Sequence, residues 1–294
     1  MRNFTESRSS GGDFARAAAR YYRRMPNRAV DLVVTDLDGT LVDSSERIHP
    51  RTIAAVHALE GAGIPVLIAT GRRPRATAWV LEPGGIPGPA VMLDGALGRD
   101  LRDGRNFHEA VFPPEAAARV LAAFRAAGLS PSLFVERPGI DMVNGENPDT
   151  HPRHLALNLP WAVCDDLERV VATEPVRTFA VVGGEAARLT EVATAIGPAG
   201  SASVTPDHLY GGHTLQVRPP GTSKWSGVES FCKTHNLDPT RVLAVGDGDN
   251  DLELLTAASI AVSITGASPT ALAAAHHIIE GPTTGGWSAI LDLV

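Results

Sequence analysis

Short apolar segments that end in acidic or Thr-Gly motifs constrain the fold of this chain more than any other feature. Residues 30–35 and 241–245 run directly into Asp-rich motifs, and residues 64–69 run into a Thr-Gly pair. Apolar segments of this length predict strands that are buried on both faces, as in a parallel sheet. Helical patterns separate these strands, so the alternation predicts an α/β fold.

The first motif places two carboxylates, Asp36 and Asp38, two positions apart and next to Gly39 and Thr40. A strand interior tolerates such acids badly, so we expect the pair at an open strand end that cations or phosphates can approach. Carboxylates this close repel each other unless a cation lies between them or one holds a proton. The pair predicts either a metal site or an acid/base pair, and the alternative is an ordinary acidic turn.

A second acidic motif, residues 246–251, follows the strand expected at 241–245. The carboxyl ends of parallel strands meet at one edge of a sheet, so we expect Asp247 and its neighbours to lie near Asp36. Such an oxygen-rich site suits a magnesium ion that keeps several waters and meets a phosphate. A calcium-binding EF-hand loop fits poorly, because a strand rather than a helix precedes the motif.

Two weaker signals lie between the acidic motifs. Thr70, Gly71 and Arg72 follow the strand expected at 64–69, where a hydroxyl and backbone N–H groups can hold phosphate oxygens. Lys224 lies near the start of the helix expected over 222–235, where an ammonium group can neutralise a bound phosphate. Taken alone, a single Lys is more often a solvated surface charge.

In this order, the four elements resemble the haloacid dehalogenase superfamily, and the Ala-Thr-Gly-Arg, Ser-Lys and Gly-Asp-x-x-Asn-Asp forms resemble its Cof-type phosphatase branch. The resemblance implies a Rossmann-like parallel-sheet core with an inserted α/β cap over the active site. The expected division is a basic N-terminal extension over 1–29, a catalytic core over 30–96 and 213–294, and a cap over 97–212.

The first acidic motif and the Thr-Gly pair have implied roles in this family. By resemblance, Asp36 is the nucleophile and a metal ligand, and Asp38 is the general acid/base whose backbone carbonyl binds the metal. Thr70, with the N–H of Gly71, holds the phosphoryl oxygens. These roles describe a phosphatase that forms an aspartyl-phosphate.

The remaining motif residues complete the implied site. By resemblance, Lys224 balances charge on the nucleophile and the phosphate, and Asp247 binds Mg²⁺ directly. Asn250 and Asp251 orient Lys224 or metal-bound waters. A carboxylate can approach an anionic phosphate only when positive charge is present, which makes the metal obligatory in this chemistry.

The chain departs from the Cof-type pattern at two positions. Asp94 stands where the family usually has Asn, and a carboxylate there repels a phosphate unless it is protonated, metal-bound or paired, for instance with Arg72. Trp225 follows the motif Lys in place of the common Gly, which we interpret as a structural change. The first departure bears on the type of substrate.

The resemblance implies hydrolysis of a small phosphorylated metabolite, with sugar phosphates favoured, because a closed cap excludes large phosphoproteins. One alternative is a phosphosugar mutase resembling phosphomannomutase, which returns the phosphoryl group to its substrate. Another is a metabolite-binding module without catalysis, which the presence of every motif residue disfavours. A dehalogenase has no need of Asp38 or of a magnesium site.

Composition limits the class of protein further. The chain has 294 residues, which allows two domains, and a net charge of −7, which argues against a nucleic-acid binder. Only Cys164 and Cys232 are present, so a reducing cytoplasm is expected and a disulfide framework is not. No apolar segment approaches the roughly 20 residues that span a membrane. The Arg-rich first 30 residues predict either a loosely ordered extension, a helix packed on its own domain, or a basic helix that docks on an acidic partner, a second subunit or an anionic membrane surface.

Overall fold

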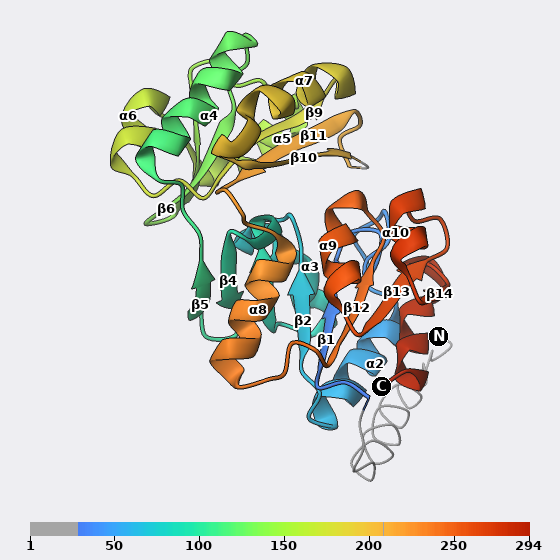
Figure 1. Ribbon diagram of the computed structural model, residues 1–294. Coiled ribbons are helices and arrows are strands. Elements are labelled where there is room, and N and C mark those ends of the chain that lie inside the picture. The colour runs from blue at the N-terminus through green and yellow to red at the C-terminus, as the bar shows by residue number, and fades with distance from the viewer. Residues whose placement is uncertain (1–28, 208) are drawn as a thin grey trace, which may run out of the picture. The chain divides into compact units, whose positions relative to one another are not determined.

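The computed structural model describes residues 29–207 and 209–294, and the chain divides into two compact units (Figure 1). The first unit runs to Ala90 and includes Arg99–Arg105 and Val228–Val294, and the second consists of Val91–Gly98 and Asn106–Gly227. Apart from residue 29, the expected basic extension lies outside the described residues. The expected core and cap boundaries stay a prediction. No helix of the described part is long and apolar enough to cross a bilayer.

The first sheet has eight strands, and its central ones are the apolar segments that the sequence singles out. The strands are β1 (Leu32–Thr35), β2 (Val66–Ala69), β3 (Pro89–Met92), β4 (Leu97–Asp100), β5 (Asn106–Glu109), β12 (Val242–Gly246), β13 (Ile260–Ile264) and β14 (His277–Ile279). Their order is β14-β13-β12-β1-β2-β3-β4-β5. β1 pairs in parallel with both β12 and β2, and β13 pairs in parallel with β12 and β14. Every residue of β1, β2 and β12 is buried, which explains their apolar sequences.

Helices connect these strands. They are α2 (Pro50–Gly61), α3 (Pro74–Leu81), α8 (Lys224–His235), α9 (Leu252–Ala257) and α10 (Pro269–Ala274). α2, α3 and α10 begin with Pro, whose missing N–H costs nothing in the first turn. α9 packs on β12, β13 and α10, and α2 contacts the C-terminal 3-10 helix Gly286–Asp292. Trp287 of that 3-10 helix is fully buried, and its Nε1 donates to Thr35 Oγ1 at 3.0 Å, so the chain's end braces the end of β1.

The second unit has a six-stranded sheet of its own with the order β10-β11-β9-β6-β7-β8. Its strands are β6 (Ser132–Arg137), β7 (Ile140–Asn144), β8 (Ala162–Cys164), β9 (Thr178–Gly184), β10 (Ser201–Pro206) and β11 (His213–Arg218), and its helices are α4 (Pro114–Ala126), α5 (Pro152–Asn158), α6 (Leu167–Thr173) and α7 (Ala186–Ile196). The pairs are antiparallel except for β7 with β8. Figure 1 shows α4, α6 and α7 together on one side of this sheet, where Phe112, Phe124 and Phe179 form the buried centre of the core.

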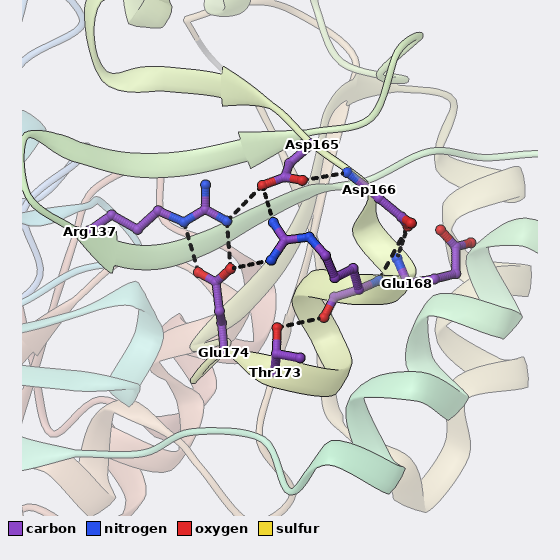
Figure 2. A network of polar contacts seen from close by, with 7 residues as sticks. Arg137, Asp165, Asp166, Glu168, Thr173 and Glu174 are labelled. Carbon is purple, nitrogen blue, oxygen red and sulfur yellow. Dashed lines mark hydrogen bonds and ion pairs between the residues drawn. The ribbon is translucent and has the colours of Figure 1, made fainter.

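A network of opposite charges ties α6 to β6 (Figure 2). Arg137 of β6 binds Glu174 at 2.6 Å and Asp165 at 3.0 Å, and Arg169 of α6 binds the same Asp165 carboxylate. The hydrogen bond from Arg169, followed by the N–H of Asp166, lowers the pKa of Asp165 to about 2. Two guanidinium groups thus face two carboxylates, and we interpret this balanced network as structural.

The α/β class and the strand and helix alternation are confirmed. The sequence did not indicate β4, β5, β7, β8, β10, α5 or α6, because these elements are short and most of them are partly exposed and lack a clear apolar pattern. After β12 the chain forms a 3-10 turn, Asp249–Asp251, and α9 starts at Leu252. This tight turn matters for the site, because it carries Asp251.

Candidate functional site

The carboxyl ends of β1 and β12 lie side by side and bring the two acidic motifs together. Thr35 is paired with Val245, and the N–H of Asp36 donates to the carbonyl of Val245 at 2.8 Å. The two strands therefore leave the sheet at the same level, with Asp36 on one and Gly246 and Asp247 on the other. Asp36 is only 6% exposed, and burial of a carboxylate in this position requires compensating charge or hydrogen bonds.

Three carboxylates from these strand ends form one cluster. Asp36, Asp247 and Asp251 each present an oxygen, and these oxygens lie within 4.8 Å of one another. Acids this close repel unless a cation or a proton offsets their charge. An all-oxygen donor set suits a hard divalent cation. The cluster fits a divalent cation, which Asp36 and Asp247 would bind while the Asp251 carboxylate lies beside them.

Gly39 and Thr40, on the turn after β1, position Asp247. The buried Thr40 hydroxyl donates to Asp247 Oδ1 at 2.6 Å, a short bond of the kind that charged acceptors form. Gly39 has a φ of +80°, and a Cβ at this position would lie 2.6 Å from Asp247 Oδ2. Both the turn and the close approach therefore require glycine. The Asp-Gly-Thr motif, which follows β1, therefore also helps to position Asp247, which follows the neighbouring strand β12.

Asp251 holds the loop that carries Asp247. Its Oδ2 accepts hydrogen bonds from the N–H of Asp247 at 3.1 Å and from that of Gly248 at 3.0 Å. Gly246 leaves the necessary space, because a Cβ there would lie 2.6 Å from Asp251 Cβ. Asp251 is 1% exposed. The structure thus gives Asp251 two tasks, as a member of the acidic cluster and as the acceptor that shapes the loop.

The Asp38 side chain is not part of the Asp36, Asp247 and Asp251 cluster. The side chain is 49% exposed, and Arg72 binds both of its oxygens, with bonds of 2.8 and 3.1 Å from Nε and 2.6 Å from Nη2. Arg72 Nη1 also binds Glu46 at 2.6 Å. Burial would lower the pKa of Arg72, but its hydrogen bond to Asp38 and the charges of Asp38 and Glu46 raise it. Arg72 therefore remains a permanent cation beside the expected acid/base.

Thr70 lies at the end of β2, the other parallel neighbour of β1. It is 1% exposed, and its Oγ1 accepts a hydrogen bond from the N–H of Arg72 at 3.1 Å. This bond occupies a lone pair and fixes the hydroxyl, whose own hydrogen can still be donated. Gly71 follows directly on the same loop. The expected phosphate-binding pair thus belongs to the same sheet edge as Asp36.

Lys224, Asp94 and Arg218 form a buried ionic cluster in the second unit. Arg218 Nη1 lies 3.2 Å from Asp94 Oδ2 and 2.9 Å from Ser203 Oγ, and Lys224 Nζ lies 3.9 Å from Asp94 Oδ1. Lys224 is 2% exposed and Asp94 is 3% exposed. Asp94 is therefore paired, which is one of the three conditions under which a carboxylate is expected to be tolerated there. Arg72, which the sequence offered as its partner, instead binds Asp38 and Glu46.

The turn around Asp94 has an unusual backbone. Leu93 and Asp94 have φ values of 53° and 47°, in the left-handed region that an apolar residue such as Leu rarely adopts. Gly95 follows, and a Cβ there would overlap the carbonyl of Ser223, next to Lys224. Close packing between these two loops thus holds the strained turn in place.

Sequence reasoning did not assign roles to Thr40, Glu46 or Arg218. The Gly-Thr pair that follows the two acids could have indicated a role for Thr40. For Arg218, the indication was its position as a charged residue at the end of an apolar strand. Glu46 had none, because its position depends on a left-handed turn with φ of 58° in an otherwise polar loop.

Comparison with known proteins decides the family. The model of the haloacid dehalogenase-like hydrolase family matches residues 33–291, which is most of the chain. The chain belongs to the haloacid dehalogenase-like hydrolases. The membership that the motifs implied is therefore confirmed. The motifs around Asp36, Thr70, Lys224 and Asp247 all fall inside the matched region.

Relatives of this hydrolase include named phosphatases. It is 25% identical over 266 residues to a phosphoglycolate phosphatase of Methanoculleus marisnigri, covering 84% of this chain and 89% of the relative. A solved phosphatase of the same superfamily from Bacteroides thetaiotaomicron matches with a TM-score of 0.75 at 21% identity and covers 92% of this chain and 98% of its own. A subclass IIB sugar phosphatase matches with a TM-score of 0.71 at 21% identity, covering 90% and 98%. These structures establish the shared fold of core plus cap.

Proposed function

We propose that this hydrolase is a Mg²⁺-dependent phosphatase that cleaves a small phosphorylated metabolite through an aspartyl-phosphate on Asp36. One observation carries the proposal: Asp36, Asp247 and Asp251 gather their carboxylates within 4.8 Å where the parallel strands β1 and β12 end, and the buried Thr70 lies at the end of the neighbouring strand β2. A phosphate ester that binds at this edge meets a nucleophile, hydroxyl and backbone donors, and a place for a divalent cation.

The proposed roles follow the chemistry of the side chains. An Asp36 oxygen attacks phosphorus as the bond to the leaving alcohol breaks, and Asp38 gives its proton to that departing oxygen. Asp38, now ionised, takes a proton from the water that attacks the phosphorus of the intermediate, and Asp36 is released. Bound Mg²⁺ supplies positive charge that lets the carboxylate approach the phosphate. Asp36 and Asp247 would hold it, together with the backbone carbonyl of Asp38.

Other residues bind and orient. Thr70 and the N–H of Gly71 hold phosphoryl oxygens, and Lys224 balances the charge that builds up on the phosphate. Asn250 and Asp251 keep this arrangement in place, Asp251 through its two bonds to the loop of Asp247. Asp94 restrains Lys224 as its ionic partner. Each role is open to substitution at a single position.

We favour small phosphate esters, and sugar phosphates first, as the substrate class. The relatives support this choice, because one is a phosphoglycolate phosphatase and one matching structure is a sugar phosphatase. The family's cap provides contacts to the leaving group, and the second unit has the size and the separate core of such a domain. The proposal places the enzyme in the cytoplasm with a small phosphate ester as its partner.

A panel of phosphorylated metabolites, assayed for free phosphate with Mg²⁺ present and after chelation, tests the proposal. We expect at least one sugar or hydroxy-acid phosphate to release phosphate only with the metal. Asp36→Asn should abolish turnover and leave the fold intact, because binding alone cannot replace the nucleophile. A panel that is inert under both conditions would overturn the proposal, and rearranged sugar phosphate without free phosphate would indicate a mutase.

A further inference from the structure

Arg72 contacts three residues near the ends of β1 and β2, namely Asp38, Glu46 and Thr70. Its Nε and Nη2 bind Asp38, its Nη1 binds Glu46 at 2.6 Å, and its backbone N–H donates to Thr70 Oγ1 at 3.1 Å. The Arg72 side chain is 17% exposed, whereas its partners Asp38 and Glu46 are 49% and 33% exposed, so the contacts lie at the surface with the guanidinium largely covered. One residue thus touches both the expected phosphate-binding hydroxyl and the expected acid/base.

Asp38 needs such a restraint. Its side chain is 49% exposed, and it lies on the turn after β1, where an unrestrained carboxylate samples several rotamers. Proton transfer requires the carboxyl oxygen within hydrogen-bond reach of the leaving oxygen, and a misplacement of about 1 Å can cost about 10²-fold in rate. The fork of Arg72 fixes the plane of the carboxylate as well as its position.

Glu46 holds Arg72 from the other side. It has a φ of 58°, an uncommon conformation for this residue, and Asp43 closes the turn by accepting from Ser45 and Arg47. A strained turn persists where surrounding contacts fix it. Its ion pair of 2.6 Å to Nη1 leaves Nε and Nη2 of the guanidinium directed at Asp38.

We infer that Arg72 is a positioning residue that orients the Asp38 carboxyl for proton transfer and couples this orientation to the Thr70 hydroxyl. The inference rests on the proposed phosphatase function. Asp38 Oδ1 accepts two bonds from Arg72 and Oδ2 accepts one, so Oδ2 keeps more free acceptor capacity. In the proposed reaction, the Asp38 carboxyl carries the proton that the leaving group needs. It gives this proton to the leaving oxygen as the P–O bond breaks, and it takes one from water in the second half-reaction.

Leaving-group dependence distinguishes this role from a structural one. p-Nitrophenolate leaves without protonation, whereas phenolate is a stronger base and benefits from an acid, and the two esters have nearly the same shape. In Arg72→Ala we expect kcat/KM for phenyl phosphate to fall by about 10²-fold, at the low end of acid/base effects. For p-nitrophenyl phosphate we expect a fall of less than about threefold, because kcat/KM reports the first half-reaction.

The controls follow from the same geometry. Arg102 makes an equivalent forked bond to Asp100, with distances of 2.7 to 3.2 Å, so Arg102→Ala should leave the ratio of the two substrates unchanged. Glu46→Gln should lower the phenyl phosphate rate by a smaller factor, since the fork to Asp38 remains. Arg72→Lys keeps the charge and loses the fork, and it provides a second variant if Arg72→Ala does not fold.

Two further measurements fix the interpretation. Inhibition by inorganic phosphate and the thermal shift caused by Mg²⁺ should be the same in Arg72→Lys as in the unmodified protein. Equal losses on both esters, or phosphate inhibition weakened in parallel with activity, would overturn the inference and make Arg72 a phosphate ligand or a structural residue. An unmodified protein that hydrolyses neither ester would instead overturn the proposed function itself.

Discussion

Replacing Thr40 with Val tests how the turn after β1 prepares the metal site. The hydroxyl of this buried residue donates to Asp247 Oδ1 at 2.6 Å, and Val has nearly the same shape without the donor. A hydrogen bond to a charged acceptor contributes about 1.5–3 kcal/mol. We therefore expect Mg²⁺ to bind about 10- to 100-fold more weakly, which is also the usual effect of losing a partner of a metal ligand.

Calorimetric titration with Mg²⁺, supported by the metal-induced shift in melting temperature, measures this loss. Thr190→Val provides the matched control, because the Thr190 hydroxyl bonds only to the carbonyl of Ala186, at 2.8 Å on a helix surface far along the chain from the site. The control should bind Mg²⁺ like the unmodified protein. An unchanged Mg²⁺ affinity in Thr40→Val would refute the reasoning that Thr40 prepares Asp247.

Two further predictions concern the charged clusters of the second unit. The pKa of Asp165 is lowered from 3.8 to about 2 by its bond from Arg169, so its stabilising contribution is present above pH 3.8 and is lost as the pH falls through about 2. In Asp165→Asn, acid unfolding followed by circular dichroism should no longer show the loss of stability between pH 3.8 and about 2 that this carboxylate causes. An unfolding curve identical to that of the unmodified protein would contradict the prediction. Asp94→Asn should lower the free energy of unfolding in urea by about 3–5 kcal/mol, because the substitution removes a buried negative charge that Arg218 contacts at 3.2 Å. A variant as stable as the unmodified protein would show that the pairing contributes nothing.

The meeting of the two acidic motifs was predictable because it depends only on local pattern and sheet topology. Parallel strands align their carboxyl ends, so Asp36 and Asp247 had to meet once their strands were neighbours. The structure shows this alignment directly, because Thr35 at the end of β1 is paired with Val245 of β12. Contacts between the two motifs could not be predicted in this way. An example is the hydrogen bond from Thr40 in the first motif to Asp247 in the second.

The partners of the arginines were beyond sequence reasoning. The charge argument required Asp94 to be protonated, metal-bound or paired, and it named Arg72 as one example of a partner. In the structure Arg72 pairs with Asp38 and with Glu46, which lies on a left-handed turn, and Arg218 at the end of β11 pairs with Asp94. Both are consequences of backbone conformation that residue types do not encode.

A crystal structure of the protein soaked in Mn²⁺, with the metal located by its anomalous scattering, tests the shared carboxylate site most directly. We predict one strong peak within bonding distance of both Asp36 and Asp247. A peak bonded to only one of them, or the absence of a peak between β1 and β12 at metal concentrations that support turnover, would contradict a common metal site at this sheet edge.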